Sequence, residues 1–167
     1  MKCNFLRVLL FVTVTISMNS CSPSTDESQT TNISSQKVVN YTYSDSEIET
    51  MDLINAYRVS IGLNALEKIN HISFKSEEHD NYMIANNVVN HNDFFYRSEN
   101  IIKVLGATSV EENIAFNYPT AQEVLKAWLA SPEHKSNIVG NFTHFGLAIR
   151  VSPTTGKKYY TNIFAKI

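Results

Sequence analysis

The sequence has little cysteine: two residues among 167, Cys3 and Cys21. Cys3 lies in a stretch typical of a removable N-terminal leader, so a processed chain would keep one cysteine and form no internal disulfide. An exported domain without disulfides depends on its hydrophobic core for stability.

Several short catalytic and nucleotide-binding signatures are also missing. The chain contains no P-loop, no G-x-G-x-x-G, no H-E-x-x-H, no C-x-x-C and no G-x-S-x-G. Their absence weakens assignments to nucleotide binding, to HExxH-type zinc proteolysis and to α/β-hydrolase chemistry.

Basic residues are not in excess, and the formal net charge of the whole chain is −2. Residues 1–20 carry two basic residues and no acidic one, so their removal leaves 147 residues with a charge of −4. That length is enough for one domain with a substantial core. The acidic balance argues against nucleic acid as a partner.

The N-terminus has the order of features typical of a secretory signal, predicted over residues 1–20. Lys2 and Arg7 precede an apolar run, Val8–Met18, and small polar residues follow it. The run is shorter than the ~20 residues that span a bilayer, so a membrane helix is the weaker interpretation. The stretch "SMNSCS" resembles a bacterial lipobox and predicts acylation of Cys21, with an ordinary signal peptide as the alternative. Two or more acyl chains would anchor the exported chain stably to a membrane.

Residues 21–45 are rich in Ser and Thr and predict a flexible tether, followed by a folded domain over 46–167. Apolar residues at steps of three and four predict a first helix over 46–61. Ser46 and Glu49 resemble its capping box, and Gly62 follows its end. A second helix is predicted over 72–87.

The remaining segments predict short helices and a closing hairpin. "RSENIIKVLG" is typical of a helix closed by glycine, and "SVEENIAF" of a strand. Further helices are predicted to begin at Pro119–Thr120 and at Ser131–Pro132. "FGLAIRV" and "KYYTNIFAK" predict a hairpin, in which only one of Tyr159 and Tyr160 should face the core. This order predicts the α+β class, with helices packed on a small antiparallel sheet.

Three residues stand in distinctive local settings: His91, Glu112 and His134. His134 follows Ser131 as an N-cap and Pro132 as the first helical residue. A helix N-terminus disfavours the imidazolium, so His134 is expected to stay neutral, with one nitrogen free as a ligand or base. Two imidazoles and a carboxylate suit either a divalent metal such as Zn²⁺ or proton transfer. Spacing alone leaves a shared site as one interpretation among others, since most buried histidines bond a backbone carbonyl.

Four phrases in this order resemble the CAP superfamily, also called the SCP-like extracellular domain: "INAYRVSIGLNAL", "VNHND", "EENIAF" and "AWLASPEHKSNIVGNFTHFGLAI". The bacterial branch, with its phrases "SH", "GENIA" and "W-x-x-S-P-G-H-R-x-N-I-L", is the most similar. The resemblance covers about Glu47 to Ile167 and implies a three-layer α-β-α sandwich with a cavity lined by histidines and glutamates. His91, Glu112 and His134 match the cavity residues of these phrases.

The sequence departs from the family phrases at three positions. Glu111 and Glu133 stand where glycine is usual, so local backbone geometry is expected to differ. Ser131 stands where many relatives have a second cavity glutamate. We expect Ser131 to act as a cap and Glu133 to lie near the site.

Other candidates around the site have mainly supporting roles. Asn113 is expected to bond backbone beside the cavity, and His144 to lie near the cleft by analogy with the family. His79 shares a helix face with Met83 and is expected to pack in the core, while His71 should face solvent.

Three functional interpretations remain open at this stage. The first is an envelope-anchored binding module for a lipid, peptide or glycan. Its His/Glu cavity either holds a divalent metal such as zinc or binds the ligand without a metal. The second is a hydrolase, in which His134 or Glu112 activates water against an envelope polymer or peptide. The third is a structural or adhesive surface domain with an inert cavity. Fold alone does not decide between them.

Overall fold

The computed structural model describes residues 39–167. The predicted leader, Cys21 and the tether as far as residue 38 lie outside the described residues. Among the helices of the described part, none is both long and apolar enough to cross a membrane. The helices are α1 (Asp45–Ser60), α2 (Asn70–Asn86), α3 (Phe94–Leu105), α4 (Ala121–Ala130) and α5 (Pro132–Ile138). The strands are β1 (Glu67–Lys68), β2 (Ser109–Phe116), β3 (His144–Val151) and β4 (Lys158–Lys166).

The predicted helices are present, with small shifts at their ends. The N-cap of α1 lies two residues before the predicted one: it is Ser44, whose side chain forms the reciprocal capping-box bonds with Glu47. Gly62, with φ of +82°, lies just after the end of α1, where a left-handed residue is expected. α2 begins two residues earlier than predicted.

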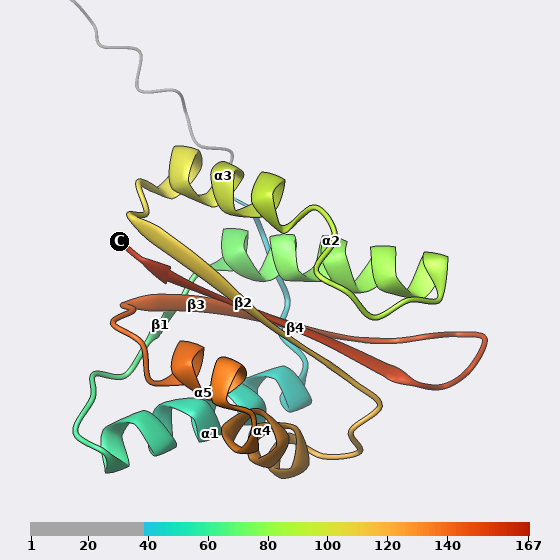
Figure 1. The fold of residues 1–167 in the computed structure, drawn as a ribbon. Helices are drawn as coiled ribbons and strands as arrows, with labels where there is room; N and C mark the ends of the chain where they lie inside the picture. The colour runs from blue at the N-terminus through green and yellow to red at the C-terminus, as the bar shows by residue number, and fades with distance from the viewer. Residues whose placement is uncertain (1–38) are drawn as a thin grey trace, which may run out of the picture. The chain divides into compact units, whose positions relative to one another are not determined.

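The four strands form one sheet in the order β1-β3-β4-β2. β2, β3 and β4 pair antiparallel as predicted, but the two-residue β1, which the sequence did not indicate, adds a parallel pair beside β3. Figure 1 shows α2 and α3 on one face of the sheet and α1, α4 and α5 on the other. The predicted three-layer α+β architecture is therefore confirmed, and β2 is one of its two edge strands.

Both faces of the sheet are buried. Tyr160 packs in the core beneath α1 and α4, whereas Tyr159 packs with Met83 of α2 on the opposite face. The expectation that only one of these tyrosines faces a core is wrong, because helices cover the sheet on both sides. At Gly146 of β3, an added Cβ would lie 2.3 Å from the backbone nitrogen of Ser73, so α2 approaches the sheet at a residue without a side chain.

The folded domain begins before the predicted boundary. Tyr41 and Tyr43 are half-buried, and their hydroxyl groups bond Glu47 and Ser73. Glu47 is fully buried, and its Oε1 accepts hydrogen bonds from Arg150 Nη1 and from the backbone N–H of Ile149 in β3. Residues 39–45 thus belong to the domain rather than to a tether.

Candidate functional site

His91, Glu112 and His134 line one pocket of about 250 Å³. His91 comes from the loop between α2 and α3, Glu112 from the edge strand β2, and His134 from α5 on the opposite side of the sheet. The pocket therefore lies at the β2 edge, where the two helical layers meet. Its full lining is His91, Phe94, Glu111, Glu112, Glu133, His134 and Asn137.

The Glu112 carboxylate is buried, and both of its oxygens accept hydrogen bonds. Oε1 accepts from His91 Nδ1 at 2.8 Å and from Arg97 Nη2 at 2.8 Å, and Oε2 accepts from Arg97 Nε at 2.9 Å. Burial by itself would raise the pKa of Glu112, but the hydrogen bonds from His91 and Arg97 and the charge of Arg97 outweigh it and lower the pKa. Glu112 is therefore an ionised acceptor.

The ionised state of Glu112 determines which ring nitrogen of His91 carries the proton. An ionised carboxylate can only accept, so Nδ1 of His91 carries the proton that it donates to Glu112. Nε2 of a neutral His91 is then unprotonated and has no hydrogen-bond partner among residues 39–167. The side chain is 49% exposed and lines the pocket.

His134 is held through the backbone of its helix. Asn113 Nδ2 donates to the carbonyl of His134 at 2.9 Å, as the sequence predicted for Asn113, and Asn137 Nδ2 donates to Asn113 Oδ1 at 2.8 Å. Burial, and then the nearby His91, lower the pKa of His134. The lowered pKa favours the neutral form expected for His134, and its main cause is burial rather than the helix end. Ser131 occupies the N-cap position of α5 without a side-chain capping bond.

Two further side chains beside the Glu112 carboxylate were not predicted to belong to the site. Arg97, 9% exposed, makes the bidentate bond to Glu112, and His79, 2% exposed, has Nε2 at 3.9 Å from Glu112 Oε1. His79 is buried as expected, but it also donates from Nε2 to the carbonyl of Asn90 at 2.8 Å. A signal for Arg97 was present: it lies between Phe94 and Ile101 on the inward stripe of α3, where a cation requires an acidic partner.

The other predicted residues are distributed as follows. Glu133 lines the pocket, as expected, and so does Glu111. Ser131 does not line it. His144 lies away from the site, near Glu67 of β1 at the other edge of the sheet, and His71 is half-buried and bonds Asn100.

The site does not fit the three-ligand zinc set that the sequence suggested. The carboxylate of Glu112 is already bound within the protein, because its two oxygens accept three hydrogen bonds from His91 and Arg97. Within the described part of the chain, no group of three His, Cys, Asp or Glu side chains is arranged to hold one ion. The pocket instead offers two imidazoles, with the guanidinium of Arg97 as the cation that balances Glu112.

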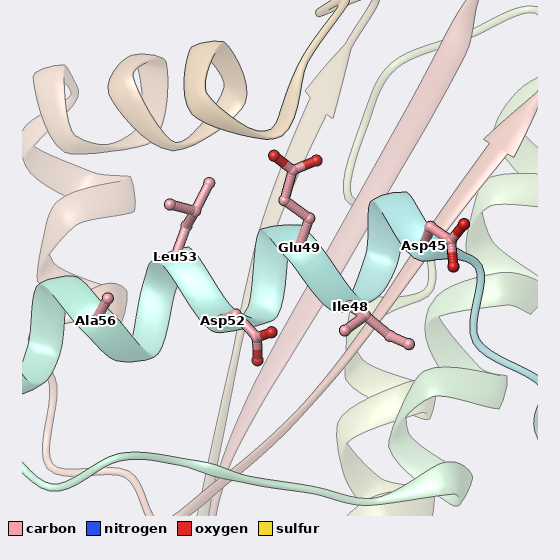
Figure 2. A pocket seen from close by; sticks show the side chains of 6 residues that line it. All are labelled: Asp45, Ile48, Glu49, Asp52, Leu53 and Ala56. Atoms are coloured by element: carbon pink, nitrogen blue, oxygen red, sulfur yellow. The ribbon is translucent and has the colours of Figure 1, made fainter.

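A separate hollow of about 430 Å³ runs along α1 (Figure 2). The described residues that line it all come from that helix: Asp45, Ile48, Glu49, Asp52, Leu53 and Ala56. None of the predicted site residues lies there, so the candidate chemistry belongs to the pocket at the β2 edge.

Residues 51–164 match the family model for CAP, the cysteine-rich secretory protein family. The chain belongs to this family, in agreement with the resemblance of its sequence phrases.

Two curated proteins of Bacillus subtilis (strain 168) are similar in sequence. The uncharacterized protein YkwD is 33% identical over 129 residues, which cover 75% of this chain and 49% of that protein. The uncharacterized membrane protein YlbC is 30% identical over 125 residues, which cover 72% of this chain and 34% of that protein. The matched region spans less than half the length of either relative.

Solved structures share the fold. An extracellular protein with an SCP domain from Bacillus anthracis has a TM-score of 0.64 and 23% identity, with coverage of 73% of this chain and 40% of that chain. An outer surface protein from Borrelia burgdorferi has a TM-score of 0.62 and 18% identity, with coverage of 74% of this chain and 96% of that chain. Venom allergen-like protein 4 of Schistosoma mansoni has a TM-score of 0.61 and 14% identity, with coverage of 74% of this chain and 90% of that chain.

Proposed function

We propose that this chain is an exported CAP domain whose pocket binds a polar envelope ligand, a peptide or a glycan, through His91 and His134. The observation that carries this proposal is the convergence of both imidazoles on one pocket from opposite helical layers. Convergence of polar side chains from distant parts of a chain is typical of a binding site.

The lining favours a polar ligand over a lipid. Five of its seven residues are ionisable, and Phe94 is the one large apolar side chain among them. A neutral imidazole accepts a hydrogen bond at its unprotonated nitrogen. Two such acceptors match ligands rich in N–H and O–H groups, which peptides and glycans supply and acyl chains do not.

A muropeptide, which combines a disaccharide with a short peptide, is a suitable probe, since its two parts can also be tested separately. Calorimetric titration should show binding by the full chain, and the double change His91→Ala, His134→Ala should weaken it at least about tenfold by removing two hydrogen bonds. His71→Ala is the matched control, because His71 bonds Asn100 outside the pocket. Binding of a fatty acid but of neither part of the muropeptide would contradict the proposal.

We also propose that the chain is anchored at the cell envelope through acylated Cys21. Support comes from the predicted leader and from the names of similar proteins, one described as a membrane protein, one as extracellular and one as an outer surface protein. Mass analysis of the mature N-terminus tests this directly: an unmodified Cys21, or cleavage elsewhere, would refute lipidation.

Hydrolysis is the second candidate, favoured by the pairing of His91 with Glu112. A carboxylate that fixes an imidazole through Nδ1 leaves Nε2 placed as a general base toward water. Incubation with peptidoglycan fragments would then release products at a rate that falls about 10²-fold or more in His91→Ala. Binding without turnover would leave the binding function and exclude this one.

A further inference from the structure

The pocket at the β2 edge presents hydrogen-bond acceptors to a ligand and few donors. The amide nitrogen of Asn137 already donates to the carbonyl of Glu112 and to Oδ1 of Asn113, and no described residue donates to Oδ1 of Asn137. Nδ1 of His91 likewise donates to Glu112. The described residues that line the pocket include no lysine, arginine, serine, threonine, tyrosine or tryptophan. Such a lining suits a ligand that donates hydrogen bonds.

Two carboxylates of the lining carry uncompensated charge. Glu111 and Glu133 are exposed, and neither side chain forms an ion pair or a hydrogen bond with another residue in the described part of the chain. Two nearby lysines lie outside the lining: Lys135 on α5, and Lys166, diagonally across β4 from Glu111. Because exposed carboxylates are ionised at neutral pH, the pocket attracts a cation.

This negative charge distinguishes the chain within its family. Glu111 and Glu133 stand where glycine is usual in the family phrases, and glycine would carry no charge. Neither glutamate has a positive φ, so the backbone at both positions suits a residue with a side chain. Glu111 comes from β2 and Glu133 from the first turn of α5, so the two carboxylates reach the pocket from separate elements.

The size and the apolar wall of the pocket indicate how much of a ligand it takes. Its volume of about 250 Å³ is below the ~300–1,000 Å³ of most small-molecule pockets. One side chain of a peptide fits such a volume better than a disaccharide does. Phe94, half-buried at the start of α3, lines the same pocket and can cover the alkyl stem of a cationic side chain.

We propose that the pocket binds the ammonium group of a lysine or another diamino acid in a peptide, and that Glu111 and Glu133 determine this specificity. An ammonium group has three donors and no acceptor, which matches a lining of carboxylates, an amide oxygen and imidazole nitrogens. The inference rests on the proposed function, because His91 and His134 supply the rest of the site. It selects the peptide part of a muropeptide over the disaccharide.

The test compares two peptides that differ by one charge: Ala-Lys-Ala with both ends blocked, and the same peptide acetylated at the lysine amine. Each is added to the full chain, and binding is followed by the ¹H–¹⁵N NMR signals of the backbone amides. The acetylated peptide should bind about tenfold more weakly, because it has lost its attraction to two carboxylates. The amide signals of Glu111 and Glu133 should be among those that the charged peptide shifts.

A double variant tests the two glutamates directly. Glu111→Gln, Glu133→Gln keeps the size of both exposed side chains and removes their charge, so it should bind the charged peptide about as weakly as the acetylated one. The matched control is Glu67→Gln, Glu78→Gln, which removes the same net charge from β1, at the other edge of the sheet, and from the exposed side of α2. This control should keep the preference for the charged peptide.

The proposal is overturned if the wild type binds the two peptides equally, or if the double variant keeps the preference. A titration with Zn²⁺ alone tests the other cation that carboxylates and imidazoles take. Binding of zinc but not of the charged peptide, lost in the double variant, would assign the carboxylates to a metal ion and also overturn it.

The proposed function is judged by a separate comparison. Equal binding of the two peptides that disappears in His91→Ala, His134→Ala would leave the proposed function standing and refute only the charge preference. Failure of the wild type to bind either peptide or the muropeptide would refute both.

Discussion

Replacement of Glu112 by Gln should destabilise the domain strongly, by about 3–5 kcal/mol of unfolding free energy. The change conserves size but removes the charge that balances Arg97, which is only 9% exposed. The substitution also replaces one carboxylate oxygen by an amide NH₂ group, which is a donor. This donor would face His91 and Arg97, whose three N–H groups now donate to the two carboxylate oxygens. An uncompensated buried guanidinium is the main cost.

The expected change in melting temperature follows from the size of the domain. Unfolding entropy is about 2.1 cal/mol/K per residue, or ~0.27 kcal/mol/K for a domain of ~130 residues. A loss of 3–5 kcal/mol thus lowers the melting temperature by roughly 11–18 °C. Thermal and urea unfolding followed by circular dichroism would measure both quantities.

Glu78→Gln is the matched control, since Glu78 forms an ion pair with Lys75 at 2.7 Å on the exposed side of α2. Such a pair contributes about 0–1 kcal/mol. The double variant Arg97→Gln, Glu112→Gln should cost less than the sum of the single changes, because neither charge remains unpaired. A Glu112→Gln cost below about 1 kcal/mol, or simple additivity in the double variant, would refute this account of the pair.

The effect should also depend on pH. Because the pKa of folded Glu112 is lowered from its usual 4.5, its stabilising contribution is present above that value and is lost as the pH falls through the lower folded pKa. The stabilities of wild type and Glu112→Gln should therefore converge in acid.

Three further changes test other parts of the structure. Burial raises the pKa of Asp80 well above 3.8, so the contribution of Asp80 to the unfolding free energy is full below pH 3.8 and declines as the pH rises. In urea titrations, Asp80→Asn should therefore stabilise the domain at pH 8 and stabilise it less at pH 4. Gly146→Ala should lower the unfolding free energy by about 1–3 kcal/mol, because the added methyl meets Ser73; an unchanged urea midpoint would contradict this. The pKa of His134 is lowered from 6.5, so the unfolding free energy of the wild type should fall as the pH drops below that value. Between pH 7.5 and 5, the unfolding free energy of His134→Gln should fall less than that of the wild type.

Local patterns predicted most secondary structure but left the exact start of α1 open. Both Ser44 with Glu47 and Ser46 with Glu49 satisfy the S-x-x-E pattern. The structure uses the first pair, in which Glu47 also accepts from Arg150 and from the N–H of Ile149 in β3. The capping pair that the structure uses is thus the one whose glutamate also makes a tertiary contact, with residues about a hundred positions further along the chain. A local sequence pattern carries no information about such a contact.

The site shows the same division. The family phrases brought His91, Glu112 and His134 together correctly, since each phrase belongs to an element of known place in the fold. They assigned Glu112 no partner, and they brought His144 to a cleft that it does not reach. Arg97 lies in none of the matched phrases, and its role depends on how α3 packs against β2.

The order of amphipathic segments, the closing hairpin and the motif phrases are properties of neighbouring residues, and they determined the α+β layers and the three residues of the pocket. The hydrogen-bond partners within the site were decided by packing, because α3 places the guanidinium of Arg97 against the carboxylate of Glu112. Hydrogen bonds and charge compensation act over a few ångströms in space, and separation along the chain does not encode them.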